Sequence, residues 1–250
     1  MAAAEVDPGD TLTCVATTKP RRLTRAAVIA VVLMMTATVD LMLLPSPTAR
    51  AVDATAIRVA SSNLIRDSHY GWPVVVLSLY EDALCPYCRK FEDTFGATVD
   101  KLIETGAVAV DYYMVAILDR PERDYSSRAG AAAYCVADES IDAFRRFHAA
   151  LYTQQPPETA ASFPDNGALI DTARQAGAGE AAVDCINNST YTEMVAGMAE
   201  ATNVAHTPTV RINGQDYELS TPEALVAKIK EIVGSVPGMD AQPTGSTQPG

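Results

Sequence analysis

An α/β fold interrupted by a block of helices is predicted for this chain, and three observations predict it. Two apolar runs of strand length, residues 73–80 and 107–118, flank a helical pattern at 86–104. Residues 121–201 then show helical spacing with no strand signal. A hairpin signal followed by a final amphipathic helix completes the order. Strand–helix–strand order is typical of two parallel strands joined by a right-handed crossover.

Composition narrows the classes of function. The chain has 250 residues, of which 48% are hydrophobic, and a formal net charge of −12. A chain of this length can bury one sizeable core, or one core with an insertion. Nucleic acid is not expected as a partner, because contacts with phosphates need a basic surface.

The N-terminal region predicts the compartment. A basic cluster precedes residues 26–44, an apolar run whose only charge is Asp40. At about 1.5 Å per residue this run nearly spans the roughly 30 Å hydrocarbon layer. We therefore expect a cytoplasmic tail over 1–25, a transmembrane anchor over 26–44, and a single-pass protein of the cell membrane. The alternative is secretion after cleavage at the A-x-A-like site of residues 49–51. Both interpretations place the folded part outside the cytoplasm.

The first half of the folded region, which we expect over 52–234, contains the strand–helix–strand unit. Residues 57–66 predict a first strand or a turn. Residues 73–80 are apolar and rich in β-branched side chains, which indicates a central strand covered on both faces. Gly106 is expected to end the helix at 86–104. Its apolar positions recur three or four residues apart, at Phe91, Phe95, Val99 and Leu102.

The second half begins with the helical block. Helices are expected at 126–137, 140–153, 166–177 and 180–200. Val210 and Ile212 alternate with polar residues just before Asn213-Gly214, a dipeptide typical of a two-residue hairpin turn. Residues 222–233 predict an amphipathic helix, and residues 236–250, rich in Pro, Gly and Thr, predict a disordered tail.

The cysteines divide by compartment. Cys14 lies in the expected cytoplasmic tail, which leaves four cysteines outside. An even number in an oxidising compartment indicates pairing, and four cysteines allow three connectivities. The close spacing of Cys85 and Cys88 favours Cys135–Cys185 as a structural disulfide. On the loop-entropy estimate this bridge stabilises by roughly 4 kcal/mol.

The Cys85-Pro86-Tyr87-Cys88 motif stands where a strand meets a helix. Unpaired N–H groups and the helix dipole favour an anion there, so Cys85 is expected to form a thiolate and react first. Cys88, one turn deeper, can resolve the mixed disulfide. Pro86 suits the first helical turn. A structural bridge within so short a loop would add little.

Zinc is a poor alternative for this motif. A structural zinc site needs four ligands. Cys135 and Cys185 stand alone, and the three histidines, His69, His148 and His206, show no ligand spacing. No metal or cofactor is expected.

The stretch "YEDALCPYCRKFE", taken together with "TPTVRING" further along, resembles the DsbA-like thiol–disulfide oxidoreductases of bacteria over residues 70–234. The resemblance implies a thioredoxin fold with a helical insertion at about 121–201. It also implies a cis Thr207–Pro208 bond that faces the two cysteines. Substrate would then contact Pro86, Tyr87, Thr207 and Pro208.

The resemblance further implies partners. These are reduced exported proteins as substrates and a quinone-coupled membrane reoxidant of the DsbB or VKOR type. The direction of exchange stays open, because strongly oxidising members carry a histidine inside the motif, whereas Pro86-Tyr87 also resembles the isomerase DsbG. Residues 52–72 are too short for the dimerisation domain of such isomerases, so a monomeric oxidase is expected. The alternatives are an isomerase or reductase, and a non-catalytic peptide-binding module.

Four further side chains near these motifs have competing interpretations. Glu81 and Asp82 either assist proton transfer to Cys88 or occupy an exposed strand end. His206 is expected in a loop at the rim of the site. Trp72 is expected to be a packing residue.

Overall fold

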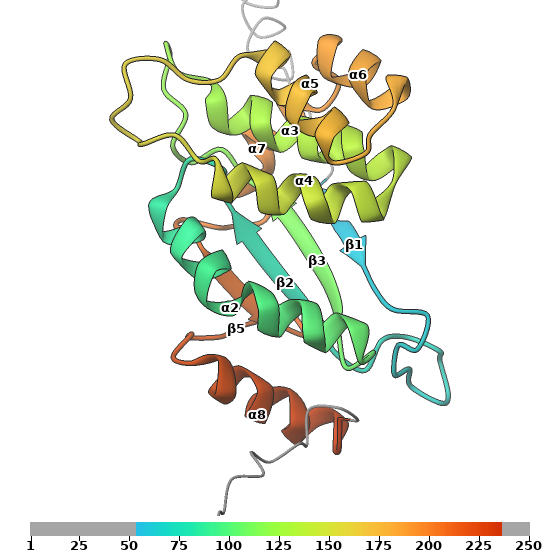
Figure 1. Ribbon diagram of the computed structural model, residues 1–250. Coiled ribbons are helices and arrows are strands. Elements are labelled where there is room, and N and C mark those ends of the chain that lie inside the picture. The colour runs from blue at the N-terminus through green and yellow to red at the C-terminus, as the bar shows by residue number, and fades with distance from the viewer. Residues whose placement is uncertain (1–53, 237–250) are drawn as a thin grey trace, which may run out of the picture. The chain divides into compact units, whose positions relative to one another are not determined.

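A computed structural model describes residues 54–236, which form a five-stranded mixed sheet with helices around it (Figure 1). The strand order is β1-β3-β2-β4-β5. Strands β2 and β3 run parallel, as predicted, and the other neighbouring pairs run antiparallel. The strands are β1 (Ile57–Val59), β2 (Val76–Glu81), β3 (Ala109–Met114), β4 (Thr209–Ile212) and β5 (Gln215–Asp216).

Helix α2 (Pro86–Glu104) joins β2 to β3 and has the predicted bounds. Its buried side chains include the four apolar residues that predicted it. Helix α8 (Pro222–Val233), which also has its predicted bounds, packs against α2. Leu225 and Ile229 of α8 are fully buried. The order and pairing of these elements are those of the expected thioredoxin fold.

The inserted helices lie at the carboxyl ends of β2 and β3 (Figure 1). The central helix of the insertion is α3, which contacts α4, α5, α6 and α7. Its residue Gly130 allows close packing, because a Cβ there would lie 2.7 Å from a Val195 methyl group. The helices are α3 (Tyr125–Glu139), α4 (Ile141–Thr153), α5 (Asn166–Gln175), α6 (Glu180–Asn187) and α7 (Thr192–Ala201).

The prediction of one helix over 180–200 was wrong, because α6 and α7 are separate helices. Ser189 between them adopts a left-handed backbone with φ of 53°. The Thr190 side chain donates a hydrogen bond to the carbonyl oxygen of Cys185, at 3.2 Å. Asn, Ser and Thr side chains compete with helical backbone bonds in this way, which ends α6 at this point.

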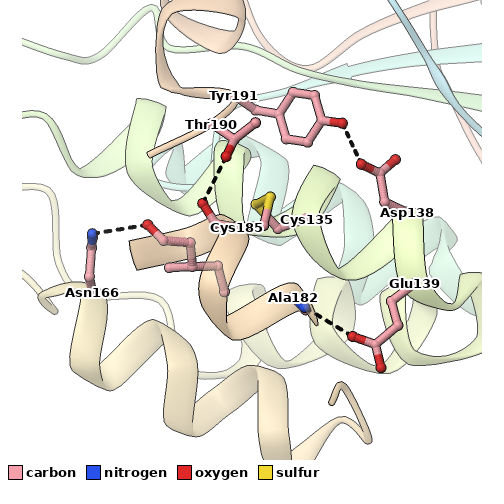
Figure 2. Close-up of a disulfide and its surroundings, with 9 residues drawn as sticks. Cys135, Asp138, Glu139, Asn166, Ala182, Cys185, Thr190 and Tyr191 are labelled. Carbon is pink, nitrogen blue, oxygen red and sulfur yellow. Dashed lines mark hydrogen bonds between the residues drawn. A yellow bond between two sulfur atoms is a disulfide. The ribbon is translucent and has the colours of Figure 1, made fainter. Parts of the chain in front are cut away.

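Cys135 of α3 and Cys185 of α6 form the expected disulfide, with Cα atoms 5.6 Å apart (Figure 2). Cys135 is buried and Cys185 is partly buried. Beside the bridge, the Glu139 carboxylate accepts hydrogen bonds from the backbone N–H groups of Gly179 and Ala182 at the start of α6 (2.8 and 3.0 Å). The disulfide therefore lies between two helices of the insertion that are also joined by hydrogen bonds.

The hairpin turn forms as predicted. Asn213 and Gly214 both have positive φ values, 50° and 80°, which a two-residue turn of this hand requires. The Asn213 side chain also accepts a hydrogen bond from the N–H of Val76 and donates one to the carbonyl of Val74. The turn is thereby attached to the start of the central strand.

Several sequence predictions fall at or beyond the ends of the described chain. Val236, the first residue of the predicted disordered tail, is fully buried. The rest of that tail (237–250), the predicted cytoplasmic segment (1–25) and the predicted anchor (26–44) lie outside the described residues. Within residues 54–236, no helix is both long enough and apolar enough to cross a membrane.

Candidate active site

Cys85 is the N-cap residue of α2, and Pro86 occupies the first helical turn, as predicted. Both cysteines of the motif are free thiols. Cys85 is 5% exposed, whereas Cys88 is fully buried one turn further along α2. The carbonyl oxygen of Cys85 accepts the N–H groups of Cys88 and Arg89 and thereby begins the helix.

The two thiols differ in acidity. The pKa of Cys85 is lowered to about 5, chiefly by a hydrogen bond from the Cys88 thiol. Burial opposes this shift, while hydrogen bonds from Thr207 and from the backbone of Cys88 and Tyr87 add to it. Burial raises the pKa of Cys88 well above its usual range, and its position beside Cys85 and Glu81 raises it further. At neutral pH Cys85 is therefore the nucleophile and Cys88 holds its proton.

The Thr207–Pro208 peptide bond is cis and lies beside the first cysteine. The Cys85 sulfur is 3.5 Å from the carbonyl oxygen of Thr207. Tyr87 is 69% exposed, which agrees with its expected place at the rim. His206 is exposed in the preceding loop, with Nδ1 3.0 Å from the Thr209 hydroxyl.

Trp72 does not have the packing role that we predicted. Its side chain is 69% exposed. It lies before the amino end of β2, whereas Cys85 follows the carboxyl end of that strand. The loop containing Trp72 is instead closed by polar contacts, because the Asp67 carboxylate accepts the N–H groups of His69 and Tyr70.

Glu81, the last residue of β2, and Asp82, which follows it, are fully buried, so the interpretation of an exposed strand end was wrong. The Asp82 carboxylate accepts the N–H groups of Leu84 and Leu118 and the Ser126 hydroxyl, at 2.6–2.9 Å. These bonds attach the cysteine loop to the start of α3. Burial raises the pKa of Asp82 to about 6. Glu81 instead contacts His148 of α4, whose Nε2 lies 2.9 Å from Glu81 Oε2.

Four residues near the cysteines were not identified from the sequence: Glu92, His148, Tyr152 and Gln155. Gln155, just after α4, donates hydrogen bonds to the carbonyl oxygens of Ala83 and Cys85, both at 3.0 Å. Tyr152 lies in one buried cluster with the two cysteines. Glu92 follows Cys88 by four residues on α2, and that spacing places both on one helix face. His148 and Tyr152 lie on α4, and no spacing in the sequence relates them to the cysteines.

A cluster of Glu81, Glu92 and His148 is the group within residues 54–236 whose atoms come close enough to hold a metal ion. One ligand atom of each residue lies within 4.8 Å of the other two. His148 Nε2 lies 2.9 Å from Glu81, while Nδ1 lies 4.0 Å from Glu92.

Comparisons with known proteins agree with this site. A family model described as "Thioredoxin" matches residues 71–231. Two solved structures from Mycobacterium tuberculosis, one named DsbG and one named DsbA, are each 60% identical and superpose with a TM-score of 0.72. The match covers 74% of this chain, with 90% of the DsbG chain and 96% of the DsbA chain. MdbA, a thiol-disulfide oxidoreductase from Corynebacterium diphtheriae, is 25% identical (TM-score 0.59), over 72% of this chain and 91% of that one.

A curated relative of another kind shares part of its length with this chain. The serine/threonine-protein kinase PknE of Mycobacterium tuberculosis is 29% identical over 160 residues, which are 62% of this chain. The match spans 28% of the kinase. The family model and the solved structures together show that this chain belongs to the DsbA-like thiol–disulfide oxidoreductases of the thioredoxin fold.

Proposed function

We propose that this protein introduces disulfides into exported proteins through Cys85 and Cys88. The observation that carries the proposal is the unequal acidity of the two thiols. A pKa of about 5 makes Cys85 a stable thiolate at neutral pH, while Cys88 stays protonated. Stabilising the thiolate stabilises the reduced enzyme, and an enzyme that favours its reduced form oxidises its partners.

The reaction proceeds by two exchanges of sulfur. A substrate thiolate attacks the Cys85 sulfur of the Cys85–Cys88 disulfide, and Cys88 leaves as a thiolate that takes up a proton. A second substrate thiolate then attacks the substrate sulfur of the mixed disulfide and releases Cys85 as its stable thiolate. The substrate loses two electrons and the enzyme gains them. Reoxidation by a disulfide-donating partner reverses these steps.

The substrate groove in this proposal lies along the Thr207–Pro208 bond. Proline has no N–H, so no donor competes at that position, and the backbone of Thr207 is available to an extended peptide. Thr207 and Pro208 are partly buried beside Cys85, and the backbone N–H of Tyr87, whose side chain is exposed, donates to the same sulfur. Pro86, in the first turn of α2, completes the rim.

The proposed setting is the outer side of the cell membrane. Residues 26–44 would anchor the protein there, or a cleaved signal would release it. A quinone-coupled membrane protein of the DsbB or VKOR type would accept the two electrons. The enzyme would act as a monomer on reduced proteins as they emerge. A fusion of alkaline phosphatase to the C-terminus tests this topology, because activity found only in the soluble secreted fraction would exclude the anchor.

A second candidate function differs from the first in the direction of disulfide exchange. The two Mycobacterium tuberculosis proteins of equal identity are named DsbG and DsbA, so an isomerase or reductase role is the second candidate. The redox potential of the Cys85/Cys88 pair separates these roles. A value above about −200 mV supports the oxidase, and a value near thioredoxin's, about −270 mV, favours a reductase.

Catalysis itself is tested with Cys85→Ser. Refolding of a reduced, disulfide-containing substrate should lose its acceleration in this variant, with Cys14→Ser as the matched control. Unchanged refolding by Cys85→Ser would contradict catalysis. The protein would then be interpreted as a non-catalytic binding module.

A further inference from the structure

The loop of residues 202–208 carries the Thr207–Pro208 bond from the helical insertion to the sheet. It begins where α7 ends, and β4 follows it directly. Near its start, Asn203 adopts a left-handed backbone with φ of 53°. Near its end, the carbonyl oxygen of Thr207 lies 3.5 Å from the Cys85 sulfur. The path of this loop therefore sets where the Thr207 backbone meets the reactive sulfur.

One side chain of β4 fastens the start of this loop. The guanidinium of Arg211 donates hydrogen bonds to the carbonyl oxygens of Thr202 and Asn203, at 3.1 and 3.3 Å. Val210 and Ile212, on either side of Arg211 in the strand, are buried. Because side chains alternate along a strand, Arg211 lies on the opposite face from these two core residues. The start of the loop is thereby attached to the strand that follows the loop.

The guanidinium of Arg211 is itself held in place by several contacts. Its Cζ lies 4.7 Å from the centroid of the buried Tyr80 ring, and it donates to the Tyr80 hydroxyl at 3.1 Å. Tyr80 in turn stacks on Tyr113, with ring centroids 4.6 Å apart. The Nε of Arg211 donates to Asp216 at 2.7 Å, and the Arg211 side chain is only 18% exposed. A planar guanidinium with five N–H donors can make these contacts together, whereas the single ammonium of a lysine cannot.

The end of the loop is fastened separately, on the same face of β4. The Thr209 hydroxyl donates a hydrogen bond to the carbonyl oxygen of His206 at 2.7 Å. Thr209 and Arg211 are two residues apart in the strand and so share a face. Thr207 follows a loop that is bonded at both ends, and loss of the Arg211 bonds would leave its start free to move.

We propose that Arg211 is a positioning residue for disulfide exchange, because it fixes the loop that presents the Thr207–Pro208 bond to Cys85 and to the substrate peptide. This inference rests on the proposed function, in which an extended peptide pairs with the backbone of Thr207. Arg211 acts through the loop, since the carbonyl groups that it binds precede Thr207 in the chain. Loss of its side chain should therefore weaken peptide binding more than the chemistry of the sulfurs.

A purely structural role for Arg211 would come from its ion pair with Asp216. That pair joins β4 to β5, and the Asp216 side chain is 77% exposed. Exposed ion pairs contribute little to stability, because water and salt screen them. The ion pair uses Nε of Arg211, whereas the bonds to the loop use Nη1 and Nη2. Asp216→Asn therefore removes the ion pair but keeps the bonds to the loop, which makes it the matched control.

Steady-state oxidation of a reduced cysteine-containing peptide, with glutathione disulfide as the reoxidant, separates positioning from stability. In Arg211→Lys and Arg211→Met we expect the KM for the peptide to rise at least about fivefold while kcat stays within about twofold, the pattern of lost binding. Reduction of the oxidised protein by dithiothreitol, which has no peptide backbone to pair with Thr207, should change by no more than about twofold. The pKa of Cys85, which Thr207 helps to lower, should rise by at least about half a unit. Asp216→Asn should match the unmodified protein in every measurement.

The outcomes separate this role from the proposed function. A folded Arg211→Lys that keeps the KM and the Cys85 pKa of the unmodified protein would overturn the positioning role, although the oxidoreductase stands. Equal changes in Arg211→Lys and Asp216→Asn would also overturn it, because the ion pair alone would then explain them. If the unmodified protein oxidises the peptide no faster than Cys85→Ser does, the proposed function itself fails. The Cys85 pKa would still test the effect of Arg211 on the loop.

The two Arg211 variants differ in how much they disturb the fold. Arg211→Lys keeps the positive charge and a long side chain, so it should fold even if Arg211→Met does not. Circular dichroism checks the fold of each variant.

Discussion

The two cysteine pairs outside the predicted anchor share one chemistry but occupy different surroundings. Cys85 and Cys88 are free thiols at the N-terminus of α2, with helix N–H groups, Thr207 and a cluster of titratable residues around them. Cys135 and Cys185 form a bridge between α3 and α6, fifty residues apart in the chain. The difference teaches that position relative to a helix end and to titratable neighbours, rather than burial alone, makes a cysteine pair reactive.

The largest expected difference between the pairs concerns turnover. Cys88→Ser should still form the mixed disulfide through Cys85 but should not resolve it, so turnover falls by at least about a hundredfold. Non-reducing gel electrophoresis after incubation with a disulfide-containing substrate should show a covalent complex, because the Cys85 thiolate attacks the substrate disulfide and expels one of its sulfurs as a thiolate. Cys135→Ser/Cys185→Ser should form no such complex. A complex in both variants would remove the distinction between the pairs.

Removing the structural bridge should affect stability instead. Cys135→Ser/Cys185→Ser should lower the free energy of unfolding by about 4 kcal/mol, because the bridge closes a loop of fifty residues in the unfolded chain. Urea denaturation followed by circular dichroism measures this loss. Cys85→Ser/Cys88→Ser provides the matched control and should change stability far less. An equal loss in the two double variants would contradict the assignment of a structural role to one pair.

Thiol ionisation should distinguish the two cysteines of the reactive pair. The folded-state pKa of Cys85 lies below its ordinary value, so its thiolate is present above about pH 5 and is lost as the pH falls through 5. Thiolate absorbance at 240 nm should titrate with this midpoint. At pH 6.5 iodoacetamide should modify Cys85 at least about a hundredfold faster than Cys88. A midpoint near 9 would show that the Cys88 thiol, Thr207 and the backbone N–H groups do not stabilise the thiolate.

The smallest expected effect concerns the link between the insertion and the site. Gln155→Ala removes two hydrogen bonds to the cysteine loop and should destabilise the reduced protein by about 1–2 kcal/mol. The rate of Cys85 alkylation should change by no more than a few fold. Gln154→Ala, at the neighbouring exposed position, is the control. Equal stabilities of the two variants would show that the hydrogen bonds of Gln155 contribute nothing.

Local patterns predicted much of this fold. The spacing of apolar residues gave α2 and α8 with their observed bounds, and Asn213-Gly214 located the hairpin turn. Predicted strands were longer than β2 and β3, since apolar residues also occupy the segments before β2 and on both sides of β3. The break between α6 and α7 was missed, because a helical pattern hides a single left-handed residue such as Ser189.

The sequence alone determined the reactive motif, since a CxxC at a strand–helix junction and a distant Thr-Pro are recognisable without coordinates. It also indicated the Cys135–Cys185 pair by counting. Tertiary structure decided what surrounds the thiols. His148 and Gln155 reach the site only because the insertion packs over the carboxyl ends of β2 and β3. Periodicity reports which face of an element is buried, but it does not report which distant side chain meets that face.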